Sequence, residues 1–236
     1  MITRWQGLGL ALSFAFATTV CRAQAVAGGN AGAGVAQSCQ ACHGAAGEGM
    51  AQIGSPRLAG LGSSYLRRQL DAFADGTRAN PLMMPIAKAL APADRAAVAD
   101  YFAAARLPSA GPAAAPAPAS TSASASAPAA GLPSQLSPGA ILATRGRWPD
   151  QLPACEQCHG PGGRGAGPDF PALTGQSAAY LTSQLTAWKT GKRPPGPLNL
   201  MAVVAKKLTD ADMRSVAEHF AALPVGGGSV VAKEAK

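Results

Sequence analysis

Two short motifs hold four of the five cysteines and two of the three histidines of the chain. They read CQACH at Cys39–His43 and CEQCH at Cys155–His159. In each, two thiols three positions apart precede a histidine, which is the pattern that attaches haem c covalently. Thiols at this spacing can bond the two vinyl groups on one edge of a porphyrin, and the imidazole that follows can ligate the iron. The motifs therefore predict covalent haem c at four cysteines with an axial histidine in each site: Cys39, Cys42, His43, Cys155, Cys158 and His159.

Other uses of cysteine and histidine explain this spacing less well. A disulfide framework accounts for an even number of cysteines in an exported protein, and zinc sites use cysteine and histidine at other spacings. A redox C-x-x-C is expected near a βαβ pattern, and the sequence has none. None of these alternatives requires a histidine directly after both cysteine pairs.

Methionine is the predicted second axial ligand of each iron. The remaining histidine, His219, aligns with Tyr101 in the internal repeat described below, so two histidines cannot ligate both irons within this chain. Methionine is the usual alternative and raises the reduction potential. The repeat equates Met83 with Met201, although Met84 stays open as the ligand in the first half. Core packing is the other role that any methionine can have.

The two halves of the chain repeat each other. PRLAGLGSSYLRRQL from Pro56 matches PALTGQSAAYLTSQL from Pro171 at a constant offset of 115. Aligned apolar positions at helical spacing, such as Tyr65–Phe73 and Tyr180–Trp188, predict an amphipathic helix in each half. We expect an all-α fold of two tandem domains, each with three or four helices and ending in a helix, at 94–106 and 210–223.

Composition divides the chain into five segments. Arg4, an apolar run and the small residues of Ala23–Ala25 predict a signal peptide over 1–25. The uncharged stretch 5–21 leaves a retained membrane anchor as the alternative. The Pro-, Ala- and Ser-rich stretch predicts a disordered linker over 108–138. The two domains are then 26–107 and 139–224, followed by a flexible tail over 225–236.

Charge and composition exclude some functions and suggest neighbours for the haem. The formal net charge is +8, but no dense run of Lys and Arg with aromatic residues occurs, so nucleic acid is not an expected partner. Aromatic residues make up only 5% of the chain, and haem would fill the sparse core of each domain. Pro56 and Pro171 lie in loops that could offer a carbonyl to the axial histidines. Four basic residues are candidates for neutralising haem propionates, with solvated surface charge as the other interpretation: Arg57, Arg78, Lys192 and Arg193.

With these motifs in place, the chain resembles a dihaem class I cytochrome c, closest to the cytochrome c-four family. The resemblance rests on both C-x-x-C-H motifs, the repeated PRLAGLGSSYL and PALTGQSAAYL segments, and the loops at Met83 and Met201. It implies two cytochrome c folds, His/Met iron, a periplasmic location and loose membrane association. It also implies single-electron transfer in a respiratory chain, between partners such as a quinol–cytochrome c oxidoreductase, a terminal oxidase or a dehydrogenase. The long linker departs from the family and puts a fixed geometry between the haems in doubt.

Three functions compete on this basis. The first is an electron carrier that is not itself an enzyme and delivers electrons towards a terminal oxidase. The second is the electron-accepting cytochrome subunit of a periplasmic dehydrogenase. The third, a haem enzyme such as a peroxidase, needs an open iron position with acid and base groups beside it. A methionine in both ligand loops and a single spare histidine argue against it.

Overall fold

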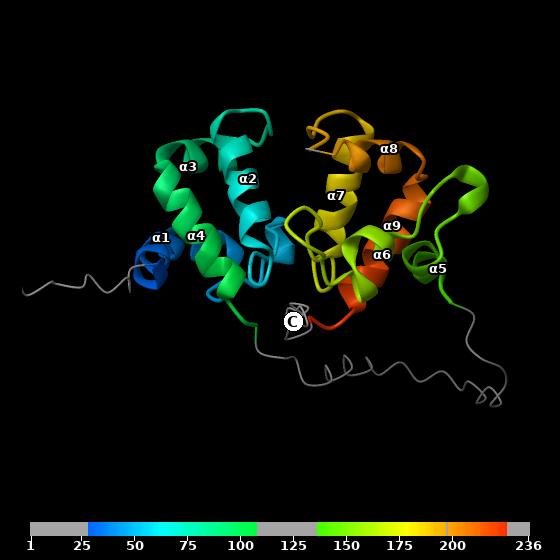
Figure 1. The fold of residues 1–236 in the computed structure, drawn as a ribbon, viewed down its shortest axis with the longest axis horizontal. Coiled ribbons are helices and arrows are strands. Elements are labelled where there is room, and N and C mark those ends of the chain that lie inside the picture. The colour runs from blue at the N-terminus through cyan, green and yellow to red at the C-terminus, as the bar shows by residue number, and fades with distance from the viewer. Residues whose placement is uncertain (1–27, 108–135, 197, 226–236) are drawn as a thin grey trace, which may run out of the picture.

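The computed structural model describes residues 28–107, 136–196 and 198–225, and Figure 1 shows that they form two helical lobes side by side. The predicted signal peptide, most of the predicted linker and almost all of the predicted tail lie outside these residues. Within the described ranges the chain contains no strand, only three isolated β-bridges. No helix there is long and apolar enough to cross a membrane. The prediction of an all-α fold of two tandem domains is confirmed.

The last three α-helices of each lobe correspond in order, whereas two short α-helices in the second lobe take the place of the first helix of the first lobe. The first lobe contains α1 (Gly28–His43), η1 (Ala51–Ile53), α2 (Ser63–Ala74), α3 (Met83–Ala89) and α4 (Pro92–Ala104). The second contains α5 (Pro138–Thr144), η2 (Trp148–Asp150), α6 (Cys155–His159), η3 (Pro161–Gly163), α7 (Ala178–Lys189), α8 (Leu200–Lys206) and α9 (Asp210–Ala222). The helix α5 begins at Pro138, the last residue of the predicted linker.

In each lobe the first helix crosses the last helix at a glycine. A Cβ on Gly32 would lie 2.3 Å from the carbonyl oxygen of Ala97 in α4, and one on Gly139 would lie 2.0 Å from that of Ser215 in α9. Only glycine allows such a close approach of two backbones. This contact fixes the helix that carries the first C-x-x-C-H motif against the terminal helix of its own lobe.

The two lobes differ where the first helix meets the motif. In the first lobe, α1 continues without interruption from Gly32 to His43. In the second lobe, nine additional residues separate Gly139 from Cys155, so α5 ends at Thr144 and the motif forms the separate short helix α6. The insertion is held by Arg147, which bonds Asp150 and forms a two-pronged pair with Asp212 of α9 at 3.1 Å.

Each lobe has a small core built largely from alanine and a few large residues. Phe102 and Phe220 are each 2% exposed and lie at equivalent positions in α4 and α9. Each ring packs over the loop after the motif, where a Cβ on Gly47 or Gly163 would lie 2.8 or 2.4 Å from it. Both glycines have positive φ, at 76° and 68°, a conformation that other residues rarely adopt. The terminal helices therefore shape the loops that follow the histidines.

Candidate functional site

The two motifs occupy equivalent positions at helix ends. His43 is the last residue of α1 and His159 the last residue of α6, and both are buried. The four motif cysteines are free thiols, as bonding to a porphyrin requires. Burial raises the pKa of the Cys39 thiol and raises that of Cys155 to about 11, so both are neutral at pH 7.

The histidines predicted as axial ligands are oriented by the carbonyls that the sequence suggested. The Nδ1–H of His43 donates to the Pro56 carbonyl at 2.8 Å, and that of His159 donates to the Pro171 carbonyl at 2.7 Å. Burial lowers the pKa of both histidines, and the carbonyl contacts oppose this effect only in part. Each ring is therefore neutral with its proton on Nδ1, which leaves the Nε2 lone pair for iron.

The methionines differ in burial: the candidate iron ligands are half-buried, whereas Met213 is fully buried. Met83 is the first residue of α3 and Met201 is the second residue of α8, and both are half-buried. The Met84 methyl group lies beside Gly76, at 3.8 Å from where a Cβ would stand. Met213 is 1% exposed in the core of the second lobe, within α9. The assignment of Met83 and Met201 as ligands stays a prediction.

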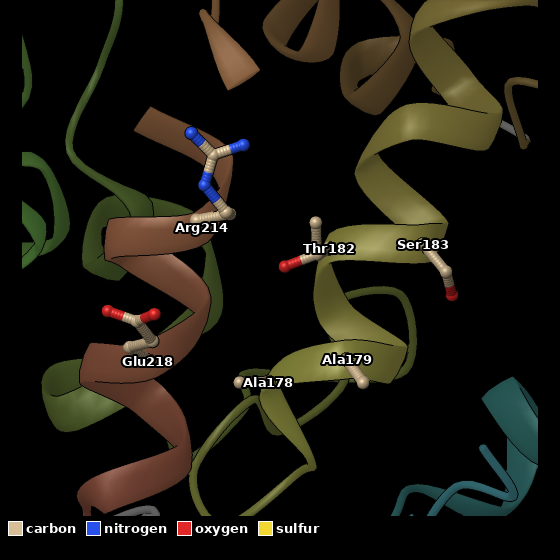
Figure 2. A pocket seen from close by; sticks show the side chains of 6 residues that line it. All are labelled: Ala178, Ala179, Thr182, Ser183, Arg214 and Glu218. Atoms are coloured by element: carbon tan, nitrogen blue, oxygen red, sulfur yellow. The ribbon is translucent and has the colours of Figure 1, made fainter. Parts of the chain in front are cut away.

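A separate cavity of about 410 Å³ lies between α7 and α9 of the second lobe (Figure 2). Its walls are small residues of α7 opposite Arg214 and Glu218 of α9, and none of the predicted haem ligands lines it. At the equivalent place in the first lobe, Ser63 donates a hydrogen bond to Asp100 across the gap between α2 and α4. The cavity thus marks the absence of one helix-bridging contact in the second lobe.

The lobes meet through α2 and α7, which face each other across the middle of the molecule (Figure 1). Arg78, after α2, donates to Tyr180 Oη at 3.2 Å and to Gln184 Oε1 at 2.7 Å. Its counterpart Arg193, after α7, makes the equivalent contacts with the first lobe, to Tyr65 Oη at 3.2 Å and Gln69 Oε1 at 3.1 Å. The arrangement is two-fold symmetric, as expected when two copies of one fold pack through the same surface.

This network closes on two glutamines. The Oε1 of Gln69 accepts from Arg78 at 2.6 Å and from Arg193 at 3.1 Å. The Oε1 of Gln184 accepts from the same two arginines at 2.7 and 2.9 Å. Each guanidinium also lies over an aromatic ring of its own lobe, Phe73 at 4.5 Å and Trp188 at 3.9 Å. Each arginine is therefore held by hydrogen bonds to a glutamine of each lobe and by contact with an aromatic ring of its own lobe.

A second set of contacts is asymmetric. The backbone N–H of Arg57 donates to Gln176 Oε1 at 2.9 Å, and Gln176 Nε2 donates to the Arg57 carbonyl at 3.1 Å. The guanidinium of Arg57 reaches the Thr174 carbonyl at 2.8 Å. Near the edge of the interface, Arg68 pairs with Asp169 at 2.9 Å. The contacts between the lobes thus answer the doubt raised by the linker: the described lobes pack against each other.

Sequence reasoning missed this interface and misjudged several charges. Helical periodicity places Tyr65 and Gln69 on an internal apolar stripe, but both contact Arg193 of the other lobe. Arg57, Arg78 and Arg193 are 2%, 7% and 6% exposed, so the interpretation as solvated surface charge is wrong for all three. Lys192, the fourth candidate, is exposed. One sequence feature could have indicated the interface. The tyrosine, glutamine and arginine that form it are each repeated at an offset of 115, as Tyr65 and Tyr180, Gln69 and Gln184, and Arg78 and Arg193.

The residues present fit haem in both lobes. Free thiols and a neutral, oriented imidazole occur at each motif. Aromatic residues make up only 5% of the chain, and a haem would fill the small core of each lobe. Three buried arginines at the interface form no ion pair with a described carboxylate, and a buried cation is stable only when an anion or hydrogen bonds compensate it. Haem propionates supply such anions.

Comparison with known proteins agrees with this geometry. Residues 30–105 and 151–223 each match the family described as Cytochrome c. The chain is 45% identical over 190 residues to the thiosulfate dehydrogenase electron acceptor of Thiomonas intermedia (strain K12), covering 80% of both chains.

Two solved structures are also similar. Reduced recombinant cytochrome c4 from Pseudomonas stutzeri has a TM-score of 0.66 and 30% identity, over 83% of this chain and 98% of that one. Thiosulfate dehydrogenase from Marichromatium purpuratum has a TM-score of 0.68 and 39% identity, over 85% of this chain. This chain spans only 41% of that longer protein.

Proposed function

The chain belongs to the cytochrome c family, and we propose that it is a periplasmic electron acceptor for a thiosulfate-oxidising dehydrogenase. It is an electron-transfer cytochrome with two covalently bound haem c groups, rather than an enzyme in its own right. The similarity to the Thiomonas intermedia electron acceptor over four-fifths of both chains carries the proposal. The matching part of the Marichromatium purpuratum dehydrogenase supports it, because there the same two-lobed unit belongs to a longer protein with that activity.

The site residues have separate roles in this proposal. The four motif cysteines hold the two haems, His43 and His159 ligate the irons on one side, and Met83 and Met201 ligate them on the other. Haem iron supplies a one-electron ferric/ferrous couple. Since methionine ligation raises the reduction potential, each site favours accepting an electron. Two one-electron sites can together take the two electrons that a dehydrogenase removes in one turnover.

The packing of the lobes supports transfer between the sites. Covalent attachment keeps each haem in its lobe, and the network of Arg78, Arg193, Gln69 and Gln184 fixes the lobes together. A fixed interface makes the electron path between the haems constant from molecule to molecule. The protein can therefore receive electrons at one lobe and release them from the other.

Stopped-flow reduction tests the donor. The oxidised holoprotein is mixed with thiosulfate and a thiosulfate dehydrogenase from the same organism, and the growth of the ferrous haem band is followed. We expect reduction of both haems at a rate that rises with the concentration of the dehydrogenase, and none with thiosulfate alone. Failure of the dehydrogenase to reduce the protein, when dithionite reduces it fully, would refute the proposal.

A carrier that delivers electrons to a terminal oxidase is the second candidate. It is favoured by the similarity to 98% of the cytochrome c4 chain from Pseudomonas stutzeri. In that case a quinol–cytochrome c oxidoreductase should reduce the protein faster than the dehydrogenase does, and oxidase should reoxidise it. The two experiments share one readout, so their rates can be compared directly.

A further inference from the structure

Arg57 is a buried cation in the first lobe that has no counterpart in the second. It is 2% exposed, and the repeat places Ala172 at the equivalent position. Its guanidinium donates to the carbonyls of Ala59 and Thr174, whereas its Nε is buried without a partner among the described residues. None of the ion pairs in the described ranges includes it. An arginine remains protonated in this position, so the lobe carries an interior positive charge that no described carboxylate neutralises.

The second lobe holds this residue beside the axial histidine of the first. The side-chain amide of Gln176, 3% exposed, bonds both the N–H and the C=O of Arg57. Arg57 follows Pro56, whose carbonyl accepts the His43 Nδ1–H at 2.8 Å. The repeat places Leu61 opposite Gln176, and leucine cannot make the reciprocal contact. The two hydrogen bonds between the Gln176 amide and the Arg57 backbone therefore occur beside the first site and have no equivalent beside the second.

The other charges near the two sites do not create the same difference. Arg78 and Arg193 are equivalent by the repeat and make equivalent contacts, so their effects on the two haems are similar. The two sites also differ by Glu48, Arg164 and Glu156, which replaces Gln40 of the first motif. Glu48 and Arg164 are exposed and Glu156 is partly exposed, so water screens their charges more than that of Arg57. Arg57 is thus the buried charge in the described residues that distinguishes the two sites.

We propose that Arg57, held by Gln176 and Thr174 of the second lobe, raises the reduction potential of the haem at Cys39–His43. The haem at Cys155–His159 has no equivalent arginine, because Ala172 follows Pro171 there. A nearby interior cation disfavours the additional positive charge of the ferric state, because the interior screens it weakly. A half-reduced protein would share one electron between the two haems, and transfer would oxidise one iron as it reduces the other. The haem of the first lobe, with the higher potential, would hold that electron for most of the time.

The expected size follows from the burial. At an effective dielectric constant of about 20, a buried unit charge near a site shifts an ionic equilibrium on the order of tenfold. For a one-electron couple, tenfold corresponds to about 59 mV. The inference rests on the proposed ligation by His43, but not on the identity of the electron donor, since potentials are measured with an electrode.

Spectroelectrochemical titration of the full-length holoprotein tests the proposal. A Met201→His version identifies the haem of the second lobe, because replacing methionine lowers that potential. We expect Arg57→Ala, which copies Ala172 into the first lobe, to lower the potential of the first haem by about 59 mV, a tenfold change, and to leave the second nearly unchanged. Arg57→Lys should retain most of the effect. Arg67→Ala removes an exposed arginine from the same lobe and is the matched control, with a shift below about threefold.

Two further outcomes decide the matter. Arg57→Met keeps most of the side-chain volume without the charge, and it replaces the alanine variant if that variant does not retain both haems. Gln176→Leu should alter the NMR haem-methyl shifts of the first haem more than those of the second, although Gln176 belongs to the second lobe. Unchanged potentials in the neutral variants, or equal shifts of both haems, would overturn the proposal.

Discussion

Removing the two symmetric arginines should release the lobes from each other. In the double variant Arg78→Ala, Arg193→Ala, all four hydrogen bonds that these side chains make across the interface are lost. Each arginine also covers an aromatic ring, Phe73 or Trp188. Truncation therefore leaves two glutamine oxygens and two tyrosine hydroxyls without their charged partners.

The magnitude follows from the contacts. A hydrogen bond from a charged donor contributes about 1.5 kcal/mol at the low end of its range, so each arginine contributes roughly 3 kcal/mol across the interface. Relief from burying the guanidinium offsets part of this, which leaves about 2 kcal/mol for each single variant. That is about a thirtyfold change in the equilibrium between packed and separated lobes. Because both arginines share Gln69 and Gln184, the two effects should not be additive.

Rotational correlation times from ¹⁵N relaxation measure the result. The wild-type holoprotein should tumble as one body of about 23.5 kDa or slightly less, whereas the double variant should show the shorter times of two tethered lobes. Arg145→Ala, which removes an exposed arginine of the second lobe, is the control and should tumble as the wild type does. If the double variant tumbles like the wild type and unfolds at the same urea concentration, the interface does not depend on these arginines.

Three other predictions concern the individual lobes. Met201→Ala should halve the sulfur-to-iron charge-transfer band of the oxidised protein, and an intact band would exclude Met201 as a ligand. Met213→Ala should leave the band intact and lower the free energy of unfolding in urea by about 2–5 kcal/mol. Burial raises the pKa of Asp212, but hydrogen bonds from Arg147 and Thr209 outweigh it and hold the pKa below 3.8. The stabilisation is therefore fully present well above pH 3.8 and is lost as the pH falls through the lower folded value, so Asp212→Asn should cost about 1 kcal/mol at pH 7 and progressively less as the pH falls below 3.8. Gly32→Ala should destabilise the first lobe by about 1–3 kcal/mol through its contact with Ala97, whereas Gly34→Ala, with no atom within 4 Å of the new methyl group, should stabilise it by roughly 0.5–1 kcal/mol; equal thermal shifts for the two would contradict the crossing geometry.

The presence of two haem c groups could be predicted from the sequence, and the assignment of individual ligands to them stays a prediction. The spacing of Cys39, Cys42 and His43 fixes which groups reach one porphyrin edge, because residues within one helical turn have almost the same geometry in every protein. The same holds for the repeat, whose matching segments align Met83 with Met201 at an offset of 118 residues. The carbonyls of Pro56 and Pro171 were also within reach of this reasoning, since a ligating histidine requires a partner for its second nitrogen.

The relation between the lobes was decided by the tertiary structure. Periodicity assigned Tyr65 and Gln69 to a stripe within one lobe, because a helical pattern shows which residues share a face and not what that face meets. The composition of the linker describes only the connecting chain, and it carries no information on how strongly the surfaces at its ends attract each other. Arg78 and Arg193 lie 115 positions apart, and Arg57 meets Gln176 across a similar separation. Such contacts depend on how two folded surfaces fit together, which no local pattern in the sequence encodes.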